Sequence, residues 1–313
     1  MKILIADKFP ESHQQALIER GHEVVFEPDL GGDDLPAKIS DFNMLLVRST
    51  QVSAETVGAA KDLKLIIRAG AGTNTIDKAA ANQAGIHVCN TPGMNSVAVA
   101  ELAMGMLLAI DRRIADNVAQ LREGRWNKKE FSKAEGIKGK TLGIAGMGAI
   151  GQALAKRALA FEMKVLGYDV VPFDAPGVDK VDTLEQLLER ADAVSLHVPM
   201  SDATKHLINA ERLALMKPGA ILLHTARGGV VDEQALIAAI KEKGLRVGVD
   251  VYEDEPAASD KEYNGELGKL PGVVGTHHIG ASTAQAQAAV ADEVLAVVDA
   301  YVKDGSFRNE VKA

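Results

Sequence analysis

The chain has 313 residues, of which 47% are hydrophobic and 25% are charged. This composition is typical of a globular protein with a buried core and excludes a chain that is mainly disordered, while the length favours two domains with an active site between them. The 35 basic and 43 acidic side chains give a net charge of −8, which disfavours binding to nucleic acid or to an acidic membrane surface. An anionic ligand must therefore be held by a local group of basic side chains.

The cysteine content and the hydropathy of the sequence indicate where the protein works. One cysteine, Cys89, excludes an intrachain disulfide and a cysteine-based zinc site. The first apolar stretch is too short for a signal peptide, and no run of about 18 apolar residues follows. We therefore expect a cytoplasmic protein that has no membrane partner.

Short runs rich in Ile, Val and Leu alternate along the chain with longer amphipathic or alanine-rich stretches. This pattern is typical of βα units that build a parallel sheet. It predicts an α/β fold of two doubly wound, Rossmann-like parallel-sheet domains with an interdomain cleft. The strands of the first series are expected at residues 3–5, 24–26, 44–47, 65–67 and 86–88, and those of the second at 142–145, 165–168, 193–196, 221–223, 247–249 and 273–275.

Two long helical patterns suggest how the domains are connected. Residues 96–122 predict one long helix with a mostly apolar surface, which we expect to be the interdomain connector. Residues 283–302 predict a closing helix with no strand after it, and we expect that helix to pack on the first domain. The predicted domains are therefore residues 1–97 with 282–313, which would bind substrate, and residues 98–281, which would bind a nucleotide.

A glycine pattern opens the second series of strands. Gly146, Gly148 and Gly151 form G-x-G-x-x-G directly after the run 142–145 and before a helical pattern. The first glycine permits a tight turn, the second lets the backbone approach a pyrophosphate, and the third lets the helix pack on the strand. The pyrophosphate would lie on free N–H groups at the positive end of that helix. Alone the pattern is weak evidence, because the chain contains 29 glycines.

The next predicted strand strengthens the nucleotide interpretation. It ends at Asp169, whose carboxylate can accept hydrogen bonds from the ribose hydroxyls of an adenosine. A 2′-phosphate would meet like charge at this position, and residues 170–172 contain no arginine to receive it. NAD is therefore favoured over NADP. A solvated strand end is the structural alternative for Asp169.

Three polar segments follow other strands of the second series. They are Thr-Ala-Arg-Gly-Gly at 225–229, the acidic stretch 250–256, and the stretch from His277 to Thr283. Because ligands bind at the carboxyl ends of strands in open parallel sheets, an arginine, a carboxylate and an imidazole are expected at one rim.

With these segments the sequence resembles the D-2-hydroxyacid dehydrogenase family. The resemblance covers nearly the whole chain, because Arg48-Ser-Thr, Arg68-Ala-Gly-Ala-Gly, Asn90-Thr-Pro-Gly and Ala100-Glu-Leu also stand in family order. It implies that His278 is the acid/base, Glu255 its partner and Arg227 the anchor of the substrate carboxylate. Imidazole titrates in the range needed to take a hydroxyl proton as hydride leaves C2, and arginine can bind a carboxylate through two parallel N–H bonds.

The resemblance also implies a set of cofactor contacts. Asp250 would lie near the nicotinamide side of NAD, and several other residues would contact the cofactor largely through their backbone. The expected cofactor-binding residues are Gly146, Gly148, Ala149, Ile150, Gly151, Asp169, Val198, Thr225, Ala226, Asp250, Gly280 and Ala281.

Arg48 and Arg68 point to the substrate, because each follows an apolar strand of the first series. Two guanidinium groups at one sheet edge would suit a phosphate at the end of the substrate remote from C2, which lactate and glyoxylate lack. Together with the resemblance, this implies oxidation of D-3-phosphoglycerate with NAD. Solvated strand ends or ion pairs remain the structural alternative. The expected substrate-binding residues are Arg48, Arg68, Gly70, Ala71, Gly72 and Arg227.

Other functions stay open at this point. A second enzyme hypothesis keeps the fold and changes the substrate to glyoxylate, hydroxypyruvate, lactate or a sulfonated 2-hydroxy acid. A hypothesis of another class is an NAD-sensing corepressor-like protein, since the family includes such proteins. A homodimer is implied by the resemblance, with residues 96–122 and the Trp126 segment in contact. We do not expect a C-terminal regulatory domain, since the chain ends soon after the last helix.

Several individual side chains keep alternatives. His277 and His278 could be metal ligands, but the chain lacks a cysteine partner and an H-E-x-x-H pattern, so no metal is expected. Glu253 is a rival for the role of Glu255. The family often has Pro at the position of His277 and Asn at the position of His224, so this chain departs from the family pattern at two positions next to the catalytic groups. His197 and His224 are expected to have structural roles.

Overall fold

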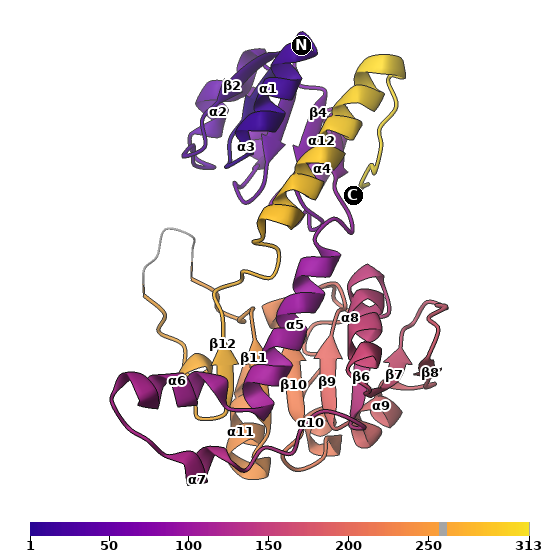
Figure 1. The fold of residues 1–313 in the computed structure, drawn as a ribbon. Helices are drawn as coiled ribbons and strands as arrows, with labels where there is room; N and C mark the ends of the chain where they lie inside the picture. The colour runs from indigo at the N-terminus through magenta and orange to yellow at the C-terminus, as the bar shows by residue number, and fades with distance from the viewer. Residues whose placement is uncertain (257–261, 313) are drawn as a thin grey trace. The chain divides into compact units, whose positions relative to one another are not determined.

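The computed structural model describes residues 1–256 and 262–312. It divides into two compact units, Met1–Asn95 with Ser282–Ala313, and Ser96–Ala281. Each unit holds a parallel sheet with helices packed against it (Figure 1). The predicted class of two parallel-sheet α/β domains is therefore confirmed. No helix among the described residues is long and apolar enough to cross a membrane.

The first unit is built on a five-stranded sheet of order β2-β1-β3-β4-β5. The central strand β3 is fully buried, as expected for a parallel strand covered on both faces. All five runs predicted for this series form strands: β1 (Lys2–Ile5), β2 (Glu23–Phe26), β3 (Met44–Val47), β4 (Leu65–Arg68) and β5 (His87–Asn90).

Helices cover the two faces of this sheet and bury separate apolar clusters. The side chains of Leu35, Phe42 and Val57 lie in one cluster, and those of Leu17, Val294 and Val298 lie in the other. The short helices of the unit are α1 (Glu11–Glu19), α2 (Leu35–Lys38), the 3-10 turn η1 (Ile39–Asp41), α3 (Ala54–Ala59) and α4 (Lys78–Gln83).

The closing helix α12 (Ala284–Asp304) belongs to this first unit. Thr283 caps its N-terminus by accepting a hydrogen bond from the amide of Ala286, and Gly305 ends it in the left-handed conformation. Its apolar face packs on β1, β3 and β4 beside α1 (Figure 1). The unit is therefore assembled from the two ends of the described chain.

The segment after α12 lies along the edge strand β5. The amide of Val311 donates to the carbonyl of Val88 at 2.8 Å, and the amide of Asn90 donates to the carbonyl of Asn309 at 3.3 Å. The ring of Phe307 stacks on that of His87, with centroids 3.5 Å apart. The segment thus covers backbone groups that an edge strand would otherwise expose.

The second unit is built on a seven-stranded parallel sheet of order β12-β11-β10-β9-β6-β7-β8. The six runs predicted for the second series all form strands. A seventh strand, β8, was not predicted, because it has three residues and only one of them, Val178, is apolar. The strands are β6 (Thr141–Ala145), β7 (Lys164–Tyr168), β8 (Val178–Lys180), β9 (Ala193–Leu196), β10 (Ile221–His224), β11 (Arg246–Val249) and β12 (Val273–Gly275).

The helices of the second unit pack on both faces of its sheet. Helix α8 (Ala149–Ala160) packs against α5 (Ser96–Asp111), and the two share one buried cluster. Thr183 caps α9 (Leu184–Arg190) by accepting from the amide of Gln186, and the side chain of Gln186 accepts from the amide of Asp182. The remaining helices and turns are α6 (Ile114–Arg122), α7 (Lys128–Phe131), α9 (Leu184–Arg190), α10 (Ala210–Leu215), η2 (Gly228–Val230), α11 (Glu233–Lys243) and η3 (Leu267–Lys269).

The prediction of one continuous helix over 96–122 is wrong. The chain leaves the helix after Asp111, and Arg113 adopts the left-handed conformation with a φ of 50°. The guanidinium group of Arg113 pairs with Asp116 at 3.1 Å and with Glu130 at 2.6 Å, which stabilises the turn. A new helix, α6, begins at Ile114 and has no buried residue among its nine.

Candidate active site

The glycine turn between β6 and α8 has three glycines with different surroundings. A Cβ atom at Gly146 would lie 2.5 Å from the carbonyl oxygen of His197, and the residue has a φ of +95°. A Cβ at Gly151 would lie 2.1 Å from the carbonyl oxygen of Gly146. A Cβ at Gly148 would meet nothing within 4 Å. Packing therefore requires the first and third glycines, whereas the second leaves open space at the start of α8.

That open space fits a dinucleotide. Helix α8 begins at Ala149 and Ile150, and no side chain caps its first amides. An anionic phosphate is the ligand that such a helix start favours, through its free N–H groups and its dipole. The three glycines with Ala149 and Ile150 thus form a cradle with the features that a pyrophosphate needs.

Asp169 lies directly after β7 and holds the same turn. Its carboxylate accepts from the amide of Met147 at 2.6 Å and from the amide of Val171 at 3.0 Å. Each carboxylate oxygen has a second lone-pair site, so the group can still accept bonds from ribose hydroxyls. Asp169 can therefore still act as the predicted ribose acceptor, and it also fixes the glycine turn through the amide of Met147.

Other predicted cofactor residues lie at the carboxyl ends of β9, β10 and β12. The amide of Val198 lies 3.1 Å from the position of a Cβ at Gly146. Thr225 and Ala226 are buried directly after β10, and the hydroxyl of Thr225 has no hydrogen-bond partner in the described structure. Gly280 and Ala281 follow β12. A buried hydroxyl without a partner is a feature that a bound ligand can satisfy.

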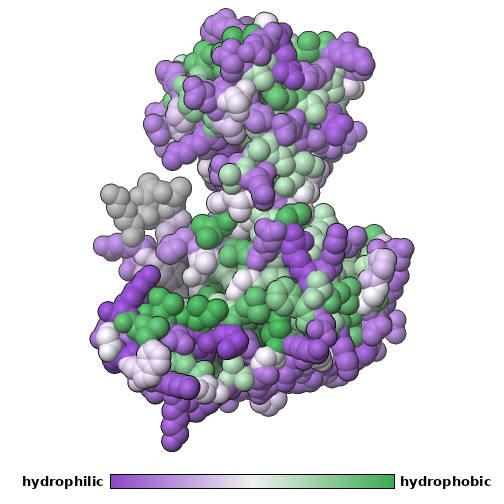
Figure 2. All heavy atoms as spheres, viewed as in Figure 1, coloured by the Kyte–Doolittle hydropathy of each residue, from purple (hydrophilic) through white to green (hydrophobic). Residues whose placement is uncertain are grey.

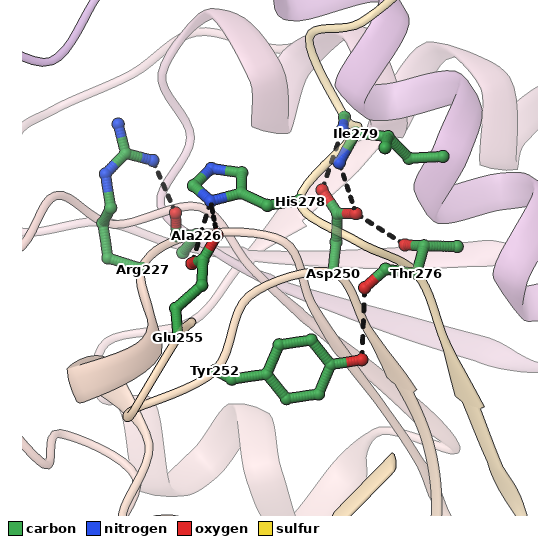
Figure 3. A network of polar contacts seen from close by, with 9 residues as sticks. Ala226, Arg227, Asp250, Tyr252, Glu255, Thr276, His278 and Ile279 are labelled. Atoms are coloured by element: carbon green, nitrogen blue, oxygen red, sulfur yellow. Dashed lines mark hydrogen bonds and ion pairs between the residues drawn. The ribbon is translucent and has the colours of Figure 1, made fainter. Parts of the chain in front are cut away.

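His278 and Glu255 form a direct pair. The Nδ1 atom of His278 lies 2.7 Å from one carboxylate oxygen of Glu255 and 2.9 Å from the other (Figure 3). The side chains are 45% and 37% exposed, so the imidazole can reach both a ligand and solvent. The competing carboxylate, Glu253, lies 2.6 Å from His206 instead.

Asp250 holds the segment that carries His278. It is 2% exposed and accepts three hydrogen bonds, from the hydroxyl of Thr276 at 2.5 Å and from the amides of Ile279 and Gly280 at 2.8 Å each (Figure 3). These three hydrogen bonds form a clamp that holds residues 276–280 on Asp250. His278 lies within this clamp and has a φ of 52°. Its backbone is thus held in a conformation that few non-glycine residues adopt.

Arg227 follows β10 on the same rim. Its Nη1 atom donates to the carbonyl of Ala226 at 2.6 Å, which leaves other N–H groups of the guanidinium for a ligand (Figure 3). The ring of His224 lies beneath this turn, with Nε2 at 3.4 Å from the carbonyl oxygen of Gly228. A Cβ at Gly228 would lie 1.8 Å from the carbonyl oxygen of Tyr252, so the turn is tightly packed.

Two buried imidazoles support the rim. Burial lowers the pKa of His197 to about 3 and that of His224 to about 4, which keeps both rings neutral near pH 7. His197 lies 2.9 Å from the hydroxyl of Ser195 on its own strand. These contacts agree with the structural roles that the sequence led us to expect for His197 and His224.

In the first unit, Arg48 and Arg68 lie at the ends of neighbouring strands. Val47 is the register partner of Arg68, so Arg48 is one residue beyond that pair. Arg68 is the last residue of β4 rather than the residue after it. Its guanidinium lies over Gly70, where a Cβ would come within 1.6 Å of Nη1. Neither Gly70 nor the following Ala71 and Gly72 belongs to a helix or strand.

Hydrogen bonds within the first unit fix these loops. Asp7 accepts from the amides of Arg48, Ser49 and Thr50 at 2.6, 3.0 and 3.0 Å. Burial alone would raise the pKa of the Asp7 carboxyl, but these bonds outweigh it and hold the pKa below its ordinary value of 3.8. Asn90 donates to the carbonyl of Ala71 at 2.6 Å.

Sequence reasoning assigned no role to three residues that shape these sites. They are Asp7, which binds the Arg48 loop, Asn90, which binds the Gly70 loop, and Thr276, which binds Asp250. Asp7 and Thr276 lie just beyond the carboxyl ends of β1 and β12, and Asn90 is the last residue of β5. The same strand-end rule that selected Arg48 would therefore have selected them.

Comparison with known proteins places the chain in a family. Residues 104–280 match the model of the D-isomer specific 2-hydroxyacid dehydrogenase NAD-binding domain. The chain belongs to this family. Its members are NAD-dependent oxidoreductases, so the resemblance seen in the sequence and the predicted cofactor are confirmed.

Individual relatives differ in their reactions. The chain is 42% identical over 308 residues to a D-3-phosphoglycerate dehydrogenase of Methanocaldococcus jannaschii, covering 95% of this chain and 57% of that protein. It is 44% identical over 298 residues to a hydroxypyruvate reductase of Thermotoga maritima, covering 94% of this chain and 96% of that protein. The chain thus spans little more than half the length of the D-3-phosphoglycerate dehydrogenases that it matches.

Solved structures agree with the fold. The TT0316 protein of Thermus thermophilus superposes with a TM-score of 0.90 at 36% identity, over 99% of this chain and all of that one. A D-2-hydroxyisocaproate dehydrogenase superposes with a TM-score of 0.88 at 29% identity, over the whole of both chains.

Proposed function

We propose that this protein oxidises D-3-phosphoglycerate to 3-phosphohydroxypyruvate with NAD. The observation that carries the proposal is the pair Arg48 and Arg68 at the carboxyl ends of two neighbouring strands. Their guanidinium groups suit a doubly charged phosphate, which arginine binds through paired charge-assisted hydrogen bonds. The net charge of −8 means that the chain as a whole repels anions, whereas this pair of arginines provides local positive charge.

The proposed roles in the second unit follow from its contacts. Glu255 accepts from Nδ1–H of His278, which fixes the tautomer with a free lone pair on Nε2. That nitrogen takes the proton of the C2 hydroxyl, and the Glu255 carboxylate stabilises the resulting imidazolium. Arg227 binds the substrate carboxylate through N–H groups that Ala226 does not occupy. NAD held by the glycine turn and Asp169 would supply the acceptor for the hydride of C2.

Reduction of hydroxypyruvate is the second candidate. It is favoured by the Thermotoga maritima relative, because that match covers more than nine tenths of both chains. Hydroxypyruvate carries an uncharged hydroxyl where phosphoglycerate carries its phosphate. The two candidates therefore differ in what they need from Arg48 and Arg68.

The test compares two substrates that differ only in the phosphate. Arg68→Gln should lower kcat/KM for D-3-phosphoglycerate by about 1.5 to 3 kcal/mol more than for D-glycerate, the usual value of a hydrogen bond to a charged group. Arg20→Gln is the matched control, because Arg20 is an exposed arginine of the same unit that pairs with Asp299 at 2.9 Å. Equal losses on both substrates would contradict the phosphate assignment, and faster turnover of hydroxypyruvate by the unaltered protein would favour the second candidate.

We further propose that the active protein is a homodimer that buries α6. Ile114, Val118 and Leu121 recur at helical spacing on α6 and are 47%, 39% and 51% exposed, and Trp126 nearby is 81% exposed. Hydrophobic surface gathers over this region in Figure 2. Sedimentation of Leu121→Glu should show monomers where the unaltered chain forms dimers, and a monomeric unaltered chain would contradict the proposal.

A further inference from the structure

The second unit contains a cavity of about 400 Å³ at the edge of the sheet opposite the glycine turn. Its wall includes Lys140, Met163, Ala193, Ile221 and Arg246, which lie at the amino-terminal ends of β6, β7, β9, β10 and β11. The glycine turn, Asp250 and His278 follow the carboxyl ends of the same sheet. The cavity is therefore separate from the site described above.

The volume and the floor of the cavity suit a small organic molecule. Pockets that bind such ligands typically enclose about 300 to 1,000 Å³ and are lined largely by apolar side chains. The apolar part of this wall includes Leu107, Ile137, Met163, Ala193 and Ile221, of which Leu107, Met163, Ala193 and Ile221 are at most 4% exposed. Such a floor favours a ligand with an apolar body.

The acidic side chains of the wall already have partners. Glu130 pairs with Arg113 at 2.6 Å and Lys133 at 2.7 Å, and Glu135 pairs with Lys140 at 2.5 Å. Two more carboxylates complete the set: Asp192 binds Lys217 at 2.7 Å and the amide of Thr141 at 2.8 Å, and Asp111 accepts from the amide of Gly136 at 3.2 Å. These carboxylates are thus occupied within the protein.

The cationic side chains of the wall exceed its acidic ones. Arg112 has no side-chain hydrogen bond or ion pair within the described residues, and Arg246 uses only Nε, which donates to the carbonyl of Gly219 at 3.1 Å. Arginine offers five N–H donors, so both guanidinium groups keep free donors. The excess charge in the cavity is therefore positive and belongs to Arg112 and Arg246.

We propose that this cavity is a second ligand site, which binds a small organic anion with an apolar body, such as an aromatic carboxylate or sulfonate. Arg112 and Arg246 bind the anionic group, and the floor around Leu107 and Met163 contacts the apolar body. The site is independent of the dinucleotide cradle and of the substrate groups.

Titration calorimetry of the full chain with naphthalene-1-sulfonate, in the presence of saturating NADH, tests the site. One sulfonate should bind per chain, and uncharged 1-naphthylmethanol should bind at least about 10-fold more weakly, since a hydrogen bond to a charged group contributes about 1.5 kcal/mol or more. Arg112→Gln should weaken sulfonate binding by about the same factor. It is the decisive variant, because Arg112 is exposed and its loss does not disturb a described contact.

The control is Arg190→Gln, which removes an exposed arginine on α9 outside the cavity wall. It should leave the sulfonate affinity within about two-fold of the unaltered protein. The proposal is overturned if the sulfonate does not bind, if NADH displaces it, if Arg112→Gln binds it as tightly as the unaltered protein, or if Arg190→Gln weakens it equally.

Discussion

Replacing Asp250 by asparagine tests how the segment around His278 is held. In the structure one carboxylate oxygen accepts from Thr276 and Ile279, and the other accepts from Gly280. Asparagine keeps a single acceptor oxygen, so at least the amide of Gly280 faces an NH₂ group and loses its bond. Because Asp250 is 2% exposed, no water replaces the lost acceptor.

The magnitude follows from that single bond. Loss of a hydrogen bond to a charged group costs about 1.5 to 3 kcal/mol, so the free energy of unfolding should fall by this amount in urea. We expect His278 to keep its φ of 52° only while the clamp holds. If the full cost of about 1.5 to 3 kcal/mol acts on the loop that carries His278, kcat should fall by about 10- to 150-fold.

Three measurements separate the effect from general damage. They are kcat by NADH absorbance, the dissociation constant of NADH by fluorescence, and unfolding in urea. Asp232→Asn is the matched control, since Asp232 caps α11 through one bond to the amide of Ala235 and asparagine caps helices equally well. If Asp250→Asn keeps the kcat and the unfolding free energy of the unaltered protein, the clamp does not hold His278.

Three further predictions follow from the sites. His278→Ala should lower kcat by about 10²- to 10⁴-fold while NADH still binds, and unchanged turnover in a steady-state assay would remove His278 from the reaction. Gly146→Ala should both destabilise the fold and abolish NADH binding. Gly148→Ala places its methyl group in open space, so its melting temperature should equal that of the unaltered protein while its affinity for NADH falls. A lower melting temperature of Gly148→Ala would contradict the cradle. The folded-state pKa of Asp7 is lowered, so its stabilising effect is present above its ordinary value of 3.8 and lost as pH falls through the folded pKa. Asp7→Asn should therefore reduce the loss of stability in acid, and an unaltered slope of unfolding free energy against pH below 4 would argue against it.

The strands were predictable because a parallel strand covered on both faces needs an unbroken apolar run, as Met44–Val47 shows. Strand β8 lies at the sheet edge and has one apolar residue, so no such run marks it. The break at Arg113 was not predictable from local periodicity, and the contact that its guanidinium makes there is with Glu130, 17 residues later. Local periodicity does not register contacts at that separation.

The pairing of Glu255 with His278 shows the same limit within the site. Residue type and the strand-end rule left Glu253 and Glu255 as rivals, and the resemblance alone selected Glu255. In the structure His206 and the start of α11 engage Glu253, and only the folded loop brings Glu255 to the imidazole. The sequence therefore predicted the residue types and the strand ends, but it did not predict which side chains pair with one another.

The placement of α12 has a consequence for synthesis on the ribosome. The second unit, Ser96–Ala281, is complete in sequence before α12 emerges, whereas the first unit lacks its closing helix until then. Meanwhile the face formed by Ile3, Ile5 and Ile67, which α12 covers in the finished protein, stays exposed on the nascent chain. Domains generally fold as they emerge, and exposed apolar surface invites aggregation during that delay. The unit encoded first therefore finishes last, and chaperone binding during translation should concentrate on it.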